Sequence, residues 1–224
     1  MPLLLHIDTA TDFATVCISD ADRIIQSMTN EEQKDHASFL QPAIKCLLQL
    51  CDLTFQQLSA ISVTAGPGSY TGLRVGIASA KGLCYALQIP LILLNTLEVM
   101  AASAIEIYDS PKTNVLFCPM IDARRTEVFT AVYNHLLEEI ISPCAMKLET
   151  NSFGKLLDEH MICFSGSGSE KASQLIKHSN AYFNKIKILP ASLAKVGNQK
   201  FEKQCFSDVA LADALYIKEF FTIL

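Results

Sequence analysis

The chain has 224 residues, of which 50% are hydrophobic, and a mean hydropathy of +0.27, which is enough apolar surface for one large or two small cores. Its net charge of −5 argues against independent binding of nucleic acid, which needs a basic surface to neutralise phosphate. The apolar residues 3–7 are few, are interrupted by His6 and lack a basic flank, so we expect no signal peptide, no membrane span and a cytoplasmic location.

The first half of the sequence begins with hairpins and continues with alternating strands and helices. Three short strand-like segments at 3–8, 14–19 and 24–28 are separated by polar turns, which predicts a meander. Helical and apolar patterns then alternate, and they predict helix 35–51, strand 60–65, helix 71–87, strand 89–94 and helix 96–107.

The second half repeats this order after a polar break at Asp109-Ser110-Pro111. Strands are predicted at 115–121, 126–133 and 139–147, followed by helix 150–159, strand 161–164, helix 169–178, strand 185–188 and helix 190–203. Such a repeat indicates an internal duplication. We expect an α/β protein with lobes 1–108 and 109–224, the last segment being free to pack back on the first lobe.

A glycine-rich segment between strand 60–65 and helix 71–87 is the most informative part of the sequence. Glycines permit unusual backbone angles, and the N–H groups of a first helical turn suit an anion such as phosphate. The candidate phosphate or nucleotide residues are Gly66, Gly68, Ser69, Thr71, Gly72 and Arg74, together with Asp8 at the end of the first strand. Two alternatives stay open: a tight connection that allows close packing, and a turn-forming role for Asp8. Neither the P-loop nor the dinucleotide pattern is present.

Other catalytic patterns are missing from the sequence. Ser69 is not in a G-x-S-x-G nucleophile elbow, since its glycine is adjacent rather than two residues before it. The five histidines contain no i, i+4 pair that could bind a metal on a helix, so we predict no metal site. None of the eight cysteines is in a C-x-x-C pair, and they are interpreted as reduced packing residues.

Helices 35–51 and 71–87 carry more apolar surface than a one-sided surface helix needs. The first has two neighbouring apolar stripes, and the second has a face of small residues beside its apolar face. We therefore predict an association surface here, the alternative being burial within the chain. The candidate interface residues are His36, Phe39, Leu40, Ala43, Ile44, Cys46, Leu47, Leu50, Gly72, Gly76 and Ser79. For His36, a hydrogen bond at the helix start is the simpler interpretation.

Several of these motifs together resemble the bacterial TsaB (YeaZ) family. They are Asp8-Thr9-Ala10-Thr11 after the first strand, Asp35-His36, the segment from Thr64 to Gly76, and Ile121-Asp122-Ala123-Arg124. The resemblance implies an actin-like (ASKHA) fold of two ribonuclease H-like lobes. It also implies a role in forming N6-threonylcarbamoyladenosine at position 37 of tRNA, beside the catalytic paralogue TsaD and a TsaE-like ATPase.

The sequence departs from the TsaD type where TsaD proteins carry a metal-binding His-x-x-x-His pair. Thr96 and Met100 stand at those positions, and neither replaces imidazole as a ligand. We therefore expect a non-catalytic subunit that activates a TsaD-like enzyme, forms a homodimer when alone, and contacts tRNA mainly through the complex. It should bind no cofactor tightly by itself, and ATP or ADP could bind within the complex. An independent actin-like ATPase or kinase and a purely structural homodimer remain alternatives.

Overall fold

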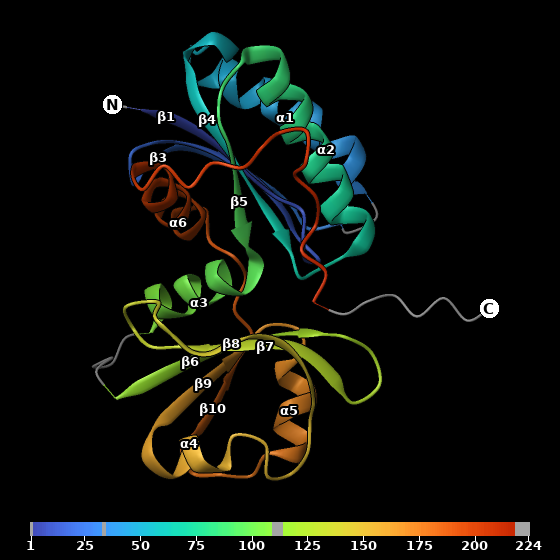
Figure 1. Ribbon diagram of the computed structural model, residues 1–224, viewed down its shortest axis with the longest axis vertical. Helices are drawn as coiled ribbons and strands as arrows, with labels where there is room; N and C mark the ends of the chain where they lie inside the picture. Colours follow the sequence, from blue (N-terminus) through green and yellow to red (C-terminus); the bar gives the residue numbers. More distant parts are fainter. Residues whose placement is uncertain (1, 33–34, 109–113, 218–224) are drawn as a thin grey trace, which may run out of the picture. The chain divides into compact units, whose positions relative to one another are not determined.

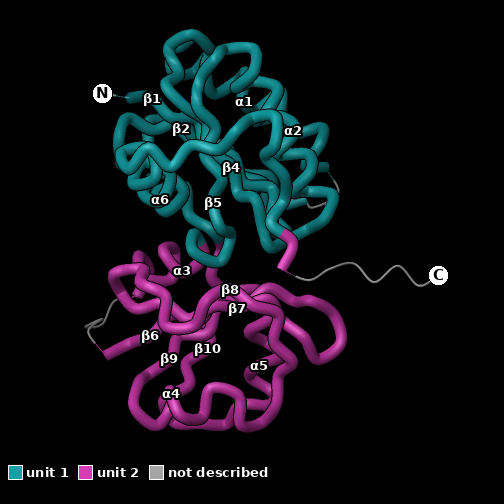
Figure 2. Tube along the Cα trace, in the orientation of Figure 1, with its two compact units in different colours: residues 1–99, 188–215 teal, residues 100–187, 216–224 magenta. Residues whose placement is uncertain are grey.

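The computed structural model describes residues 2–32, 35–108 and 114–217, which form two compact units (Figure 2). The first unit contains Met1–Val99 and Ile188–Leu215, and the second contains Met100–Lys187 and the residues after Leu215. The first boundary lies between Val99 and Met100 rather than between the expected residues 108 and 109, and residues 188–215 belong to the first unit, a return that was allowed for the last segment. The polar break expected at 109–111 lies outside the described residues.

The first unit contains a five-stranded mixed sheet in the order β3-β2-β1-β4-β5. Strand β1 pairs antiparallel with β2 and parallel with β4, and β5 extends the parallel side. The strands are β1 (Leu3–Asp8), β2 (Ala14–Asp20), β3 (Arg23–Asn30), β4 (Leu58–Gly66) and β5 (Leu91–Asn95). Strands β1 and β4 are buried almost throughout, as expected for neighbours covered on both faces.

Helices cover both faces of this sheet (Figure 1). Helices α1 (His36–Leu50) and α2 (Tyr70–Leu87) lie on one face, and α6 (Pro190–Glu202) lies on the other. A short 3-10 turn, η2 (Phe55–Gln57), precedes β4. Helix α6 packs closely enough that a Cβ at Gly197 would lie 2.8 Å from the His6 ring of β1. This contact explains why the helix expected at 190–203 belongs to the first unit.

The second unit repeats the strand order of the first, with the sheet β10-β9-β6-β7-β8. Both sheets consist of three antiparallel strands followed by two parallel ones, which confirms the predicted duplication. The strands are β6 (Val115–Asp122), β7 (Glu127–Tyr133), β8 (Glu139–Lys147), β9 (Met161–Ser165) and β10 (Ala181–Asn184), with helices α4 (Gly154–Glu159) and α5 (Ser169–Leu175). Helix α3 (Thr96–Ile107) contains the boundary between the units.

The predicted strand 185–188 is wrong, since the last strand is β10 at Ala181–Asn184. Its pairing with β9 stacks Phe183 on Phe164 with ring centroids 5.0 Å apart, and this contact outweighs the alternating pattern of residues 185–188. Helices α4 and α5 are shorter than expected. Helix α4 begins only after Phe153, whose φ of 65° is incompatible with a right-handed helix.

Within the described part of the chain, no helix is both long and apolar enough to cross a membrane.

Candidate functional site

The glycine loop, defined here as residues 66–72, lies directly on the chain that leaves strand β1. Ser69 caps helix α2, and its backbone N–H donates to the Ala10 carbonyl at 2.7 Å. A Cβ at Gly68 would overlap the Ala10 carbonyl oxygen, and one at Gly72 would overlap that of Thr9. These two glycines are therefore required for close packing, which was the alternative interpretation of the motif.

Two N–H groups that could face a phosphate are already hydrogen-bonded inside the chain. The Ser69 N–H is bonded to Ala10, and the Gly72 N–H donates to the Ser69 hydroxyl at 3.3 Å. The Thr9 hydroxyl donates to the Gly72 carbonyl at 2.7 Å, which ties β1 to α2. Thr71 is exposed on the first turn of α2, and the Arg74 guanidinium lies 4.0 Å above the Tyr70 ring.

Asp8 is fully buried at the end of β1. Its Oδ1 accepts hydrogen bonds from the Thr64 hydroxyl at 2.7 Å and from the Ala10 N–H at 3.0 Å, whereas its Oδ2 has no partner among the described residues. Burial raises the pKa of this carboxyl from its ordinary 3.8 to about 6, although the two hydrogen bonds and the electrostatic interaction with His36 act in the opposite direction. One oxygen of Asp8 therefore holds Thr64 and Ala10 in place, while the other is left without a hydrogen bond.

The groups that surround Asp8 determine what its second oxygen could bind. Across the described residues, no three His, Cys, Asp or Glu side chains come together in a way that could hold a metal ion. Thr96 and Met100 are both buried, and the Thr96 hydroxyl has no hydrogen-bond partner. The Oδ2 atom of Asp8 could accept one hydrogen bond or contact one cation. The glycine loop beside it, however, is already hydrogen-bonded to Thr9 and Ala10.

A C-terminal strap, defined here as residues 207–215, crosses the edge of the sheet and reaches the glycine loop. Its ends are fixed by backbone hydrogen bonds from Ser207 to Leu91 at 2.8 Å and from Leu215 to Ala65 at 2.6 Å. A Cβ at Gly66, which has a φ of 127°, would lie 2.6 Å from the Leu215 carbonyl oxygen. The strap therefore packs against the start of the loop.

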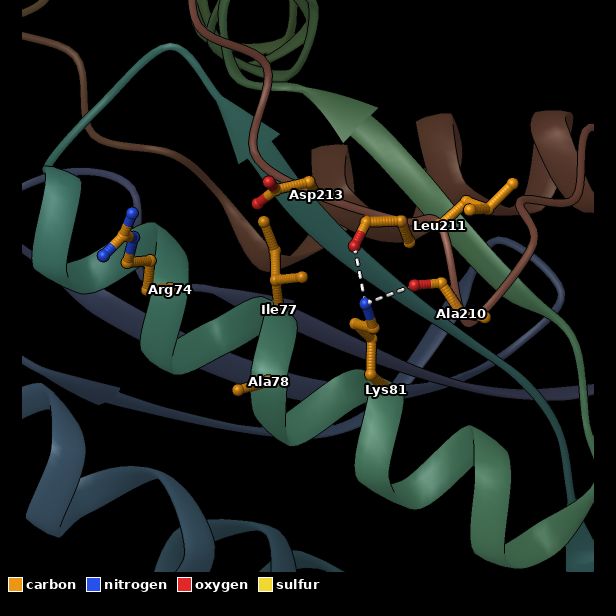
Figure 3. Close-up of a pocket in the computed structure, with 8 residues that line it drawn as sticks. Arg74, Ile77, Ala78, Lys81, Ala210, Leu211 and Asp213 are labelled. Atoms are coloured by element: carbon orange, nitrogen blue, oxygen red, sulfur yellow. Dashed lines mark hydrogen bonds between the residues drawn. The ribbon is translucent and has the colours of Figure 1, made fainter.

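Lys81 of α2 attaches the strap at its centre (Figure 3). Its ammonium donates to the carbonyls of Ala210 at 3.1 Å and Ala212 at 2.8 Å. The sequence analysis did not single out Lys81, because backbone acceptors leave no signal in the sequence. An open hollow of about 570 Å³ lies beside it, lined by Arg74, Ile77, Ala78, Lys81 and residues 210–213.

The candidate association surface needs correction. His36, Leu40, Ala43, Ile44 and Leu47 are all buried, so they lie in the chain's own core. The His36 Nε2 is 3.0 Å from the Thr11 carbonyl, as the simpler interpretation of this residue expected, and its Nδ1 has no partner. One apolar stripe of α1, made of Leu40, Ile44, Leu47 and Leu48, is therefore buried, and the other, made of Phe39, Ala43, Cys46 and Leu50, is buried only at Ala43.

Gly72 and Gly76 of α2 were predicted to contact a partner, but they contact Thr9 of the same chain. A Cβ at Gly76 would overlap the Thr9 hydroxyl, just as one at Gly72 would overlap the Thr9 carbonyl. Both glycines therefore serve contacts within the first unit. Of the candidate interface residues on α1, Leu50 is exposed, at 62%, and Phe39 and Cys46 are half-buried. On α2 Ser79 is half-buried, and the exposed face contains Ala78, Gly82, Tyr85 and Ala86.

A family model described as TsaD, tRNA N6-adenosine threonylcarbamoyltransferase, matches residues 23–213. The chain belongs to this family. The relatives that it matches include TsaB (YeaZ) proteins. The tRNA threonylcarbamoyladenosine biosynthesis protein TsaB of Bacillus subtilis is 37% identical over 141 residues, which are 62% of this chain and 59% of that protein. The TsaB of Haemophilus influenzae is 28% identical over 96% of this chain and 83% of that protein.

The solved structure of YeaZ from Pseudomonas aeruginosa has the same fold. It superposes with a TM-score of 0.81 at 22% identity, over 96% of this chain and 100% of that one. The expected α/β architecture, an actin-like (ASKHA) fold of two ribonuclease H-like lobes, is therefore confirmed. The match to the B. subtilis TsaB spans less than two thirds of that protein's length.

Proposed function

We propose that this chain is a non-catalytic TsaB-type subunit that binds and activates a TsaD-like enzyme in forming N6-threonylcarbamoyladenosine at position 37 of tRNA. Membership of the threonylcarbamoyltransferase family and the names of the TsaB relatives support the reaction. In this proposal a TsaE-like ATPase joins the assembly, tRNA is held mainly by the complex, and the chain forms a homodimer when alone. The assembly acts in the cytoplasm.

The observation that carries the non-catalytic assignment is the internal use of the glycine loop. The N–H groups of Ser69 and Gly72 are bonded within the chain, and the strap packs on Gly66. A phosphate would have to displace these contacts before it could bind there. We therefore expect ATP or ADP to bind this chain weakly unless a partner completes the site.

The exposed face of α1 and α2 supports the proposed association. We define the helix-pair surface as Phe39, Cys46 and Leu50 of α1 with Ala78, Ser79, Gly82, Tyr85 and Ala86 of α2. Tyr85 and Leu50 are 75% and 62% exposed, so two large side chains are accessible beside the small residues of α2. Aromatic anchors surrounded by small neighbours suit the core of a protein interface.

Substitutions on this surface test the proposal directly. Leu50→Glu and Tyr85→Glu should each leave the chain folded while reducing capture of a TsaD-like partner by at least tenfold, because each places a charge in the interface. Ile140→Glu, at a comparably exposed apolar residue of β8 in the second unit, is the matched control and should keep full capture. Ala43→Glu should unfold the protein, since Ala43 is buried. Pull-down with circular dichroism distinguishes these outcomes, and full capture by both surface variants would refute the assigned interface.

Nucleotide turnover distinguishes this function from an independent ATPase or kinase. The purified chain should neither hydrolyse ATP at an enzymatic rate nor make the modified nucleoside without its partners. Titration calorimetry should give weak binding of ATP. Metal-dependent hydrolysis that survives repurification and is lost in Asp8→Asn would instead support the ATPase.

A further inference from the structure

The turn between strands β6 and β7 has an unusual backbone. Arg124 and Arg125 are consecutive, and their φ angles of 70° and 49° lie in the left-handed region. This region favours Gly, which has no Cβ to approach the following carbonyl, and Asn and Asp, whose short polar side chains can hydrogen-bond locally. Two arginines in succession there are costly for the fold, and such strain is often retained where a function depends on it.

The surrounding structure holds this turn in place. The Asp122 carboxylate accepts from the Arg124 N–H at 2.6 Å and from the Lys171 ammonium of α5 at 2.8 Å. The Asp122 N–H donates to the Ser167 hydroxyl at 3.1 Å, and Lys171 also donates to the Glu127 carbonyl at 3.2 Å. The backbone is thus fixed on several sides, and the arginines are presented from a rigid position.

The two guanidinium groups are exposed and have no acidic partner within the described residues. Asp122 is neutralised by Lys171, and Glu127 lies opposite Lys147 of β8 in the sheet register. Lys147 is itself 3.8 Å from Glu149. The lysines near the turn therefore have acidic neighbours, and the arginines supply a local positive charge on a chain whose net charge is −5.

We infer that the Arg124–Arg125 turn contacts phosphates of the tRNA backbone when the assembly binds its substrate. This inference rests on the proposed function, which brings tRNA to the complex. Guanidinium groups bind phosphate through paired N–H donors. The exposed residues around the turn, such as Thr126 and Ser167, are polar, so the site lacks the apolar anchors of a protein interface but suits a phosphate contact.

A pair of double variants tests this inference. Arg124→Asn/Arg125→Asn removes both guanidinium groups, and Asn tolerates left-handed backbone angles, so the turn should persist. Lys155→Gln/Lys177→Gln removes the same charge from exposed residues of the same unit and is the matched control. Binding of an unmodified tRNA transcript to the complex with the TsaD-like partner is measured by fluorescence anisotropy at several salt concentrations. The Asn pair should weaken binding about tenfold at 0.1 M salt and lower the salt slope by about two.

Each outcome decides the inference. An unchanged affinity and slope for the Asn pair, or an equal loss in the control pair, would overturn it. Weaker partner capture with unchanged tRNA binding would also overturn it, because the turn would then contact an acidic protein segment. Arg124→Lys/Arg125→Lys keeps the charge without the paired donors, and should retain the slope while losing part of the affinity. If the wild type captures no partner, the proposed function fails and this inference fails with it, whereas normal capture with unchanged tRNA binding by the Asn pair overturns the inference alone.

Discussion

At the scale of one residue, the charged form of the buried Asp8 carboxyl lowers the stability of the folded protein. Its carboxyl is fully buried, one oxygen has no partner, and the pKa is raised to about 6. A buried carboxyl of this kind favours its neutral form, so the folded protein binds a proton more tightly than the unfolded chain. Charged Asp8 therefore opposes folding at neutral pH.

The variant Asp8→Asn should reveal this cost as a pH-dependent difference in stability. Because the folded pKa of about 6 exceeds the ordinary 3.8, wild-type stability falls as the pH rises through this window and is constant above it. The variant lacks the charge, so we expect similar stabilities at pH 4 and an advantage for the variant of about 3 kcal/mol at pH 7. Urea unfolding at both pH values measures it. An advantage that does not change with pH would contradict the assigned burial.

Helix α2 shows at the scale of one element how glycine can serve different purposes. Gly76 faces Thr9 of the chain's own core, whereas a Cβ added at Gly82 meets nothing within 4 Å. The sequence places both glycines on one small-residue face. Only the structure distinguishes the glycine that a core contact requires from the one that is exposed.

Alanine substitutions at these two glycines should therefore have opposite effects. Gly76→Ala should destabilise the protein by about 1–3 kcal/mol, because its methyl group would overlap the Thr9 hydroxyl. Gly82→Ala should stabilise it by up to about 1 kcal/mol, the helix-propensity difference between the two residues. Thermal unfolding of the two variants and the wild type compares them. Equal effects on stability would mean that the Thr9 side chain can move away from the added methyl group without destabilising the protein.

The sequence predicted the elements better than their surfaces. The hairpins, the alternating strands and helices, and the duplication all follow from periodicity. The outer face of α1 did not, because Ala43 and Cys46 share one apolar stripe in the sequence, yet Ala43 is buried and Cys46 only half-buried. The strap was missed for a different reason, since it is held by backbone carbonyls that any sequence would supply.

At the scale of the whole molecule, the first unit is discontinuous in sequence. Helix α6 and the strap come from residues 188–215, after the whole of Met100–Lys187 has been traversed. His6 of β1 is completely buried, with its ring nitrogens 2.7 Å and 2.8 Å from the hydroxyls of Ser62 and Ser19 and with Gly197 of α6 against its ring. Burial lowers the pKa of His6 to about 3, so an intact first unit keeps this ring neutral.

Fragments should separate the two units by their ability to fold. A fragment 1–108 should lack a cooperative unfolding transition, because one face of its sheet would be uncovered, whereas 96–187 should unfold cooperatively. Joining 1–108 to 188–215 through a long Gly/Ser linker should restore the transition. Calorimetry of the three polypeptides measures this. Cooperative unfolding of 1–108 alone would mean that α6 is dispensable.

This discontinuity also has a consequence during synthesis on the ribosome. The five strands of the first sheet emerge early, but the helix that covers one of its faces emerges only after residues 100–187, a delay on the order of ten seconds at ordinary elongation rates. The main part of the second unit, Met100–Lys187, is contiguous and can fold within that interval. The nascent chain therefore exposes a largely apolar sheet face while its later half folds, and the part of the protein made first is the last to be completed.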